Sequence, residues 1–206
     1  ELRPGDAIVL HDHQPLAAWP GKCTRDEGYL VGLLIGDGTL KHDKAVLSVW
    51  DPELRFEANG GPVVSDGVRG VMAAVESAMR SLAHRADFKG WQRPIEGRGE
   101  FRLASGAVRT LALSLGLAPG AKRITPSIEE ESSDFYRGFL RGLFDADGSV
   151  EATQAEGVSV RLTQADHANL EAVQRMLMRL GIVSTIYSER RPAGSRRLPD
   201  GRGGHR

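Results

Sequence analysis

A short pattern occurs twice in this sequence, and the duplication limits the possible folds more than any other feature. Residues 30–38 read LVGLLIGDG and residues 140–148 read LRGLFDADG, so both copies end in Asp-Gly. Small residues recur at every fourth position: Gly28, Gly32 and Gly36 in the first copy, and Gly138, Gly142 and Ala146 in the second. Glycine inside a helix costs about 1 kcal/mol relative to alanine. A row of small residues on one face therefore indicates two helices whose backbones approach closely.

The same packing would place the carboxylates of Asp37 and Asp147 side by side, at the C-terminal ends of the two helices. Either Asp-Gly alone is a common turn former, but a matched pair indicates a shared role. Adjacent carboxylates repel each other unless a cation lies between them, and Mg²⁺ prefers oxygen ligands. We therefore expect a divalent-metal site where the two helices end.

The two segments resemble the paired LAGLIDADG motifs of homing endonucleases, and the second copy is close to the family consensus. Residues 122–126 (KRITP), followed by FLRG at 139–142, resemble the block that precedes the second motif in intein-borne members. The resemblance covers most of the chain, from about residue 24 to about residue 187. It implies an α+β fold in which two pseudo-symmetric αββαββα repeats form saddle-like antiparallel sheets around a central two-helix interface.

The resemblance also implies a metal-dependent DNA endonuclease, a hydrolase that cuts both strands of a long asymmetric site. It assigns Asp37 and Asp147 as catalytic metal ligands and the carbonyl groups of Gly36 and Ala146 as the rest of the protein's metal shell, with Mg²⁺ (or Mn²⁺) as cofactor. Lys122 matches the lysine of the block before the second motif, which would act near one scissile phosphate. A solvated surface lysine is the alternative. The sequence contains no lysine after Asp147, so the second half lacks an obvious counterpart.

Two further polar residues lie near the second motif. Asp145 has no acidic counterpart in the first copy, where Ile35 stands. We therefore interpret Asp145 as a helix-end or hydrogen-bonding residue rather than a metal ligand. Gln164 follows an expected strand and is a candidate for orienting water, with an ordinary strand-end polar residue as the alternative.

Basic residues on or beside the expected hairpins are assigned to double-stranded DNA, because the major groove admits a two-stranded ribbon. They are Lys41, Lys44, Arg55, Lys89, Arg93, Arg98, Arg102, Arg161, Arg190 and Arg191. Trp50 and Trp91 are interpreted as packing residues. The formal net charge is +0, so the assignment depends on where charge gathers rather than on its sum. It predicts salt-sensitive binding, and ordinary solvated charge is the alternative at each position.

Local patterns predict the order α-β-β-α-β-β-α in each half. Thr24 and Glu27 form a capping box for a helix over residues 25–36. The other expected elements are a turn at 41–44, a strand at 45–50, helices at 66–82 and 105–115, a hairpin across 88–103, a second motif helix capped by Ser132 or Ser133, strands at 148–151 and 158–162, a helix at 166–180 and a strand at 182–187. The second repeat is expected to lack its final strand and helix.

The 206 residues divide into three predicted parts. Residues 1–22, through an L-x-x-G-D-x-I pattern, resemble a remnant of an intein splicing (Hint) domain followed by a linker. Residues 23–120 and 121–206 are the two LAGLIDADG repeats. A single cysteine, Cys23, allows no internal disulfide and is typical of a reducing compartment, so the cytoplasm is expected. No apolar run approaches the roughly 20 residues of a membrane helix, so no membrane partner is expected. The paired repeats are expected to act as a monomer.

The function has one alternative from another class. The sequence at residues 27–30 (EGYL) resembles that of endonucleases inserted in adenosylcobalamin-dependent ribonucleotide reductases. This resemblance favours an intein-borne enzyme. The alternative is a catalytically weak or inactive LAGLIDADG nucleic-acid-binding protein, such as a maturase or a transcriptional regulator. Such relatives often lose the acidic residues, and both are present here. The sequence therefore favours the endonuclease.

Overall fold

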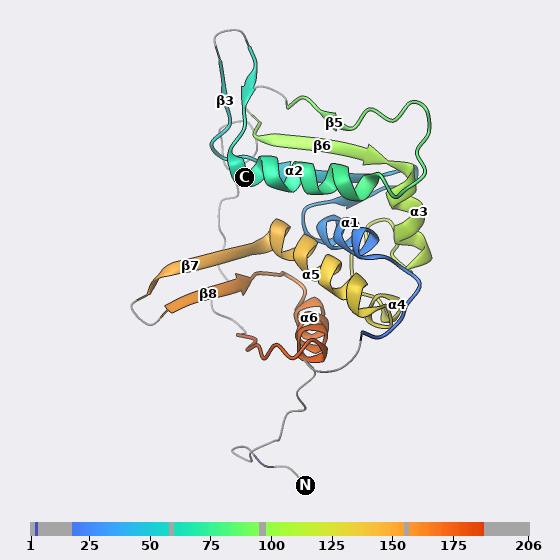
Figure 1. Ribbon diagram of the computed structural model, residues 1–206, viewed down its shortest axis with the longest axis vertical. Coiled ribbons are helices and arrows are strands. Elements are labelled where there is room, and N and C mark those ends of the chain that lie inside the picture. The colour runs from blue at the N-terminus through green and yellow to red at the C-terminus, as the bar shows by residue number, and fades with distance from the viewer. Residues whose placement is uncertain (1–2, 4–17, 58–59, 95–97, 155–156, 188–206) are drawn as a thin grey trace.

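A computed structural model describes residues 3, 18–57, 60–94, 98–154 and 157–187 (Figure 1). The elements in chain order are α1 (Arg25–Gly36), β1 (Thr39–Leu40), β2 (Ala45–Trp50), β3 (Arg55–Phe56), β4 (Pro62–Val63), α2 (Asp66–Met79), β5 (Trp91–Gln92), β6 (Glu100–Ser105), α3 (Gly106–Ser114), α4 (Pro126–Glu129), α5 (Ser133–Asp147), β7 (Gly148–Gln154), β8 (Gly157–Leu162) and α6 (His167–Arg179). The α+β class with antiparallel sheets is confirmed. No helix in the described ranges is long and apolar enough to span a bilayer.

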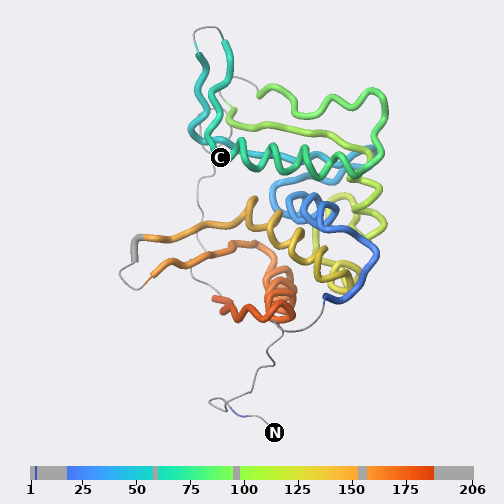
Figure 2. The backbone as a smooth tube through the Cα atoms, viewed as in Figure 1, coloured from blue at the N-terminus to red at the C-terminus, as the bar shows by residue number. Residues whose placement is uncertain are grey.

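The two motif helices, α1 and α5, lie side by side at the centre of the molecule (Figures 1 and 2). Their glycines allow this contact. A Cβ atom added to Gly32 would fall well under 3.0 Å from the carbonyl oxygen of Phe139, and one added to Gly138 would meet the carbonyl oxygen of Arg25 equally closely. The capping box predicted for α1 is present, and Ser132 rather than Ser133 caps α5. The glycine spacing therefore predicted the central interface correctly.

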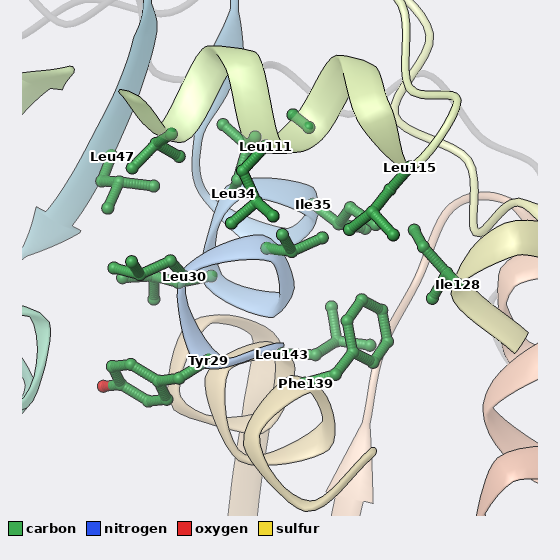
Figure 3. Close-up of a cluster of buried hydrophobic side chains, with 14 of the residues drawn as sticks. Tyr29, Leu30, Leu34, Ile35, Leu47, Leu111, Leu115, Ile128, Phe139 and Leu143 are labelled. Carbon is green, nitrogen blue, oxygen red and sulfur yellow. The ribbon is translucent and has the colours of Figure 1, made fainter. Parts of the chain in front are cut away.

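The first half contains a four-stranded antiparallel sheet in the order β1-β2-β6-β5. The sheet and α3 lie on one side of α1, and α5 lies on the other. As a result, α1 is buried from Gly28 to Ile35. Figure 3 shows side chains from α1, β2, α3, α4 and α5 meeting in one apolar cluster, in which Leu30, Leu34 and Leu47 have no exposed surface.

The second half repeats the helix-hairpin-helix order with α5, β7, β8 and α6. Its sheet differs from the first, because within the described residues β8 pairs with β7 alone. Val150, the counterpart of Leu40 in the repeat, is 66% exposed, whereas Leu40 is 4% exposed. The strand predicted over residues 182–187 is wrong, since that segment is irregular. A strand needs a neighbour for its peptide groups, and the described part of the chain places none beside this segment. Instead, the Gln174 side chain donates to the carbonyl of Ser184 at 2.9 Å.

Two small elements were not predicted from the sequence. The hairpin β3–β4 interrupts the first repeat, and buried Asp51 closes its base by accepting from the backbone N–H groups of Glu53 at 3.0 Å and Ser65 at 2.8 Å. Helix α4 precedes the second motif and is capped by the Thr125 hydroxyl. Both escaped prediction because strands of two residues and a single helical turn carry too little periodicity.

Residues 18–22, which precede α1, contact the second half through Trp19. The indole N–H of Trp19 donates to the carbonyl of Glu131 at 2.8 Å, and the ring packs edge-on against Tyr136 with centroids 5.3 Å apart. The backbone N–H of Ser133 donates back to the carbonyl of Trp19 at 3.2 Å. Residues 18–22 were predicted to belong to an upstream part and its linker. The contacts place this stretch against the start of α5, while residues 1–2 and 4–17 lie outside the description.

We expect Glu131→Ala to lower the free energy of unfolding by about 2–3 kcal/mol, because three backbone N–H groups, at least partly buried in these bonds, would lose their shared acceptor. The Glu131 side chain accepts from the backbone N–H groups of Lys22 at 2.9 Å, Cys23 at 3.0 Å and Ser132 at 3.3 Å. Urea denaturation would measure the change. The neighbouring Glu130 is exposed, so Glu130→Ala is the matched control and should change stability little. Equal effects of the two substitutions would contradict this account.

Candidate functional site

The candidate site lies where the two motif helices end. Asp37 is the residue that follows the last turn of α1, and Asp147 is the last residue of α5. A Cβ atom added to Gly36 would lie 3.1 Å from a carboxylate oxygen of Asp147, and closer still to the Cβ of Ala146. The two helix ends are therefore in contact. The structure brings the two predicted carboxylates together, each about half-buried.

The surroundings of Asp37 and Asp147 disfavour ionisation of both carboxyl groups. Burial, together with the charge of the Asp147 carboxylate, raises the pKa of Asp37 to about 6, while Lys122 opposes the shift. Burial also raises the pKa of Asp147, against the hydrogen bond from Gln164 and the charge of Lys122. A bound divalent cation would favour the ionised form of both acids.

Lys122 lies at the site, as the resemblance implied. Its ammonium group donates to the carbonyl oxygens of Gly36 at 2.9 Å and Gly38 at 2.6 Å, on either side of Asp37. Partial burial lowers the pKa of Lys122, and the two aspartates counter that shift. The alternative of a freely solvated lysine is therefore wrong. The Gly36 carbonyl, predicted as a metal ligand, bonds Lys122 here, and its second lone pair leaves it able to bind a cation as well.

The donor set fits a hard divalent cation. Two carboxylates and main-chain carbonyls are oxygen ligands of the kind that Mg²⁺ and Mn²⁺ accept. Ala146 lies in the last turn of α5, where helix carbonyls have no intrahelical partner. In the described ranges no group of three or more His, Cys, Asp or Glu side chains could hold a metal. The carbonyls would therefore have to contribute.

The other two candidates near the second motif take different positions. The Gln164 amide donates to Asp147, so it reaches the acid pair rather than only ending a strand. Asp145 accepts from the Tyr29 hydroxyl at 2.9 Å and lies 3.6 Å from the Arg141 guanidinium. These partners agree with the interpretation of Asp145 as a hydrogen-bonding residue.

Sequence reasoning missed a third acid. Glu100, on β6, is buried, accepts from the Ser48 hydroxyl at 2.9 Å and lies 2.6 Å from the Arg102 guanidinium. Its charge is one of the causes that raise the pKa of Asp37. The sequence offers no signal for this role, because a glutamate two residues before an arginine in a strand is typical of a solvated surface pair.

The residues assigned to DNA lie mostly on exposed parts of the described chain. Lys41, Arg55, Lys89, Arg93, Arg98 and Arg102 are exposed, Lys44 and Arg161 are partly exposed, and Arg190 and Arg191 lie outside the described residues. Three of these basic groups face an acid: Lys44 is 3.3 Å from Asp43, Arg102 is 2.6 Å from Glu100, and Arg161 is 3.8 Å from Glu151. The local positive charge is therefore smaller than a count of basic residues indicates.

The two predicted packing tryptophans differ. The Trp91 side chain packs against the core and donates to the carbonyl of Met72 at 3.2 Å. Trp50 is 52% exposed, so its interpretation as a packing residue is wrong. The strand register explains the difference, because Trp50 pairs with Glu100 and Trp91 pairs with Leu103, on opposite faces of the sheet.

Comparisons with known proteins agree with this architecture. Residues 134–203 match the family model of the LAGLIDADG-like domain. The fold aligns with that of the homing endonuclease I-DmoI, solved in complex with DNA and Mn, over 79% of this chain and 81% of the other, with a TM-score of 0.50 and 18% identity. Residues 134–203 are thus similar to the LAGLIDADG-like domain, and the chain shares the fold of the I-DmoI structure. The family resemblance and the fold expected from the paired motifs are confirmed.

Two curated relatives are, by their names, a reductase subunit and a polymerase. The chain is 25% identical over 208 residues to the ribonucleoside-diphosphate reductase NrdEB subunit alpha of Bacillus subtilis, across 99% of this chain and 18% of that protein. It is 34% identical over 101 residues to a DNA polymerase of Thermococcus litoralis, across 48% of this chain and 6% of the polymerase. The chain therefore spans less than a fifth of the length of either relative.

Proposed function

We propose that this chain is a site-specific DNA endonuclease, which hydrolyses phosphodiester bonds on both strands of a long asymmetric site with a divalent cation. The observation that carries the proposal is the contact between the two helix ends, which holds Asp37 and Asp147 together in a half-buried position. Such a pair costs stability on its own, since both carboxyl pKa values are raised. Residues kept in a state that opposes folding are candidates for function.

The side chains at the site have distinct proposed roles. A divalent cation held by Asp37, Asp147 and the carbonyls of Gly36 and Ala146 would neutralise phosphate charge and lower the pKa of the attacking water. The Lys122 ammonium is placed to stabilise negative charge that develops on the phosphate beside Asp37. The Gln164 amide holds the Asp147 carboxylate in one orientation. Mg²⁺ is the proposed cation, and Mn²⁺ is its substitute.

The relatives support an intein setting. A nuclease segment that corresponds to 18% of a reductase subunit and 6% of a polymerase fits an insertion carried within unrelated host enzymes. We propose that the chain is the endonuclease part of such an insertion, that residues 1–22 are the remnant of its splicing domain, and that the host is a ribonucleotide reductase. The protein would act as a monomer on double-stranded DNA in the cytoplasm.

Cleavage of an uninterrupted host gene tests the function. We expect the protein to linearise a plasmid that carries the uninterrupted reductase gene in Mg²⁺ or Mn²⁺, and to leave intact the same plasmid with the insertion in place. Chelation of the metal should stop cleavage, and binding should weaken steeply as salt rises. A salt-dependent gel shift without any cleavage in either metal would instead favour the binding-only alternative, and neither binding nor cleavage would contradict both.

A further inference from the structure

Lys122 reaches the acid pair from a stretch of irregular chain. Residues 122–125 form neither helix nor strand, yet the Lys122 ammonium bonds two carbonyls beside Asp37. The stretch connects the two repeats and belongs to no sheet in the described structure. Because a long lysine side chain has considerable rotamer freedom, some other contact must hold its backbone for the ammonium to keep this position.

The contact comes from helix α6 of the second half. The side-chain oxygen of Asn169 accepts from the backbone N–H of Ile124 at 2.9 Å, and its amide nitrogen donates to the carbonyl of Lys122 at 3.4 Å. Asn169 is only 5% exposed. A side-chain amide carries both a donor and an acceptor. Asn169 therefore bonds the chain on both sides of residue 123, as a neighbouring strand would.

A second contact pins the same stretch from the same helix. The Arg123 guanidinium lies 2.8 Å from Asp166, the residue that caps α6. The Arg123 side chain is 75% exposed, so this ion pair contributes little. The buried amide of Asn169 is the stronger anchor, because a backbone group that is buried without a hydrogen-bond partner destabilises the fold.

We propose that Asn169 is a positioning residue, which sets Lys122 against Asp37 and thereby makes cleavage of one DNA strand depend on α6 of the second half. The inference rests on the proposed endonuclease function. Lys122 lies on the Asp37 side of the site, where its ammonium bonds the carbonyls of Gly36 and Gly38. Displacing Lys122 should therefore impair one strand more than the other. A misplacement of about 1 Å at a reacting centre can reduce the rate by about 100-fold.

The cleavage test follows both strands separately. A duplex target labelled on either strand gives the two scission rates for the wild type, Asn169→Leu and Gln174→Leu. We expect Asn169→Leu to slow one strand by about 10- to 100-fold and the other by much less. Gln174→Leu is the matched control, because it removes an amide on the same helix that bonds Ser184 instead. In a Lys122→Met background, Asn169→Leu should add no further loss.

Equal slowing of both strands, or a full additional loss in the Lys122→Met background, would show that Asn169 acts only on stability and would overturn the proposal.

A second measurement does not depend on DNA cleavage. Acetylation of the Lys122 amine by an N-hydroxysuccinimide ester, followed by mass spectrometry, should be several-fold faster in Asn169→Leu than in the wild type or Gln174→Leu. If Asn169→Leu leaves the acetylation rate of Lys122 unchanged, the positioning role is rejected. If the wild type does not cut DNA but Asn169→Leu still raises the acetylation rate, only the endonuclease function is rejected.

Discussion

Replacing Gly138 with alanine should lower the free energy of unfolding by about 3 kcal/mol or more, because overpacking against a rigid neighbour has no easy relief. The added methyl would fall well under 3.0 Å from the carbonyl oxygen of Arg25 and about 3.0 Å from the backbone nitrogen of Tyr29. Both atoms belong to the backbone of α1 and its start, so no side-chain rotation can make room. The helices would have to separate along the interface. Urea denaturation of the purified variant measures the loss.

Gly70→Ala is the matched control for this substitution. Gly70 lies inside α2, and an added Cβ there would meet no atom within 4 Å. Alanine is favoured over glycine in a helix, so Gly70→Ala should raise the free energy of unfolding by about 0.5–1 kcal/mol. The two identical changes should thus have opposite signs. If Gly138→Ala also stabilised the protein, α1 and α5 would not be packed backbone against backbone.

The central interface could be predicted because its signal is local and repeated. Small residues at every fourth position need only the helical period to define a face, and Gly32 and Gly138 lie on the faces that meet. The strand expected at residues 182–187 had an apolar pattern but no partner within the described chain, and a strand is stable only beside another. Elements that depend on distant pairing are therefore where the sequence misleads.

The same distinction applies to the site. Asp37 and Asp147 end the repeated motif, so their pairing follows from the interface itself. Glu100 and Asn169 are buried at the site's margins by β6 and α6, and no local pattern distinguishes them from ordinary surface residues. Arg102 was assigned to DNA because it lies on an expected hairpin, and that assignment gives no indication of its close contact with Glu100.

Asp37→Asn should abolish cleavage and stabilise the metal-free protein at the same time. Loss of one acid from the pair should reduce the cleavage rate on the order of 10³-fold or more. The pKa of Asp37 is about 6 in the folded protein against an ordinary value of 3.8. Between these values the folded state binds more protons than the unfolded state, so stability falls as pH rises through this window. At neutral pH the ionised carboxylate therefore opposes folding, and the neutral amide of asparagine removes that penalty.

The expected gain in the free energy of unfolding at pH 7 is about 1 kcal/mol, well below the full value of the pKa shift because Asp37 is only half-buried and solvent screens its charge. The wild type should approach the stability of the variant as pH falls below about 6, and added Mg²⁺ should stabilise the wild type more than the variant.

Asp145→Asn is the matched control from the same motif. Its carboxylate bonds Tyr29 outside the acid pair, so its loss should leave cleavage in place and give no stabilisation. If Asp37→Asn is stabilised but still cuts DNA, the raised pKa of Asp37 is unrelated to catalysis. If Asp37→Asn neither gains stability nor loses cleavage, this carboxylate has no role in the site.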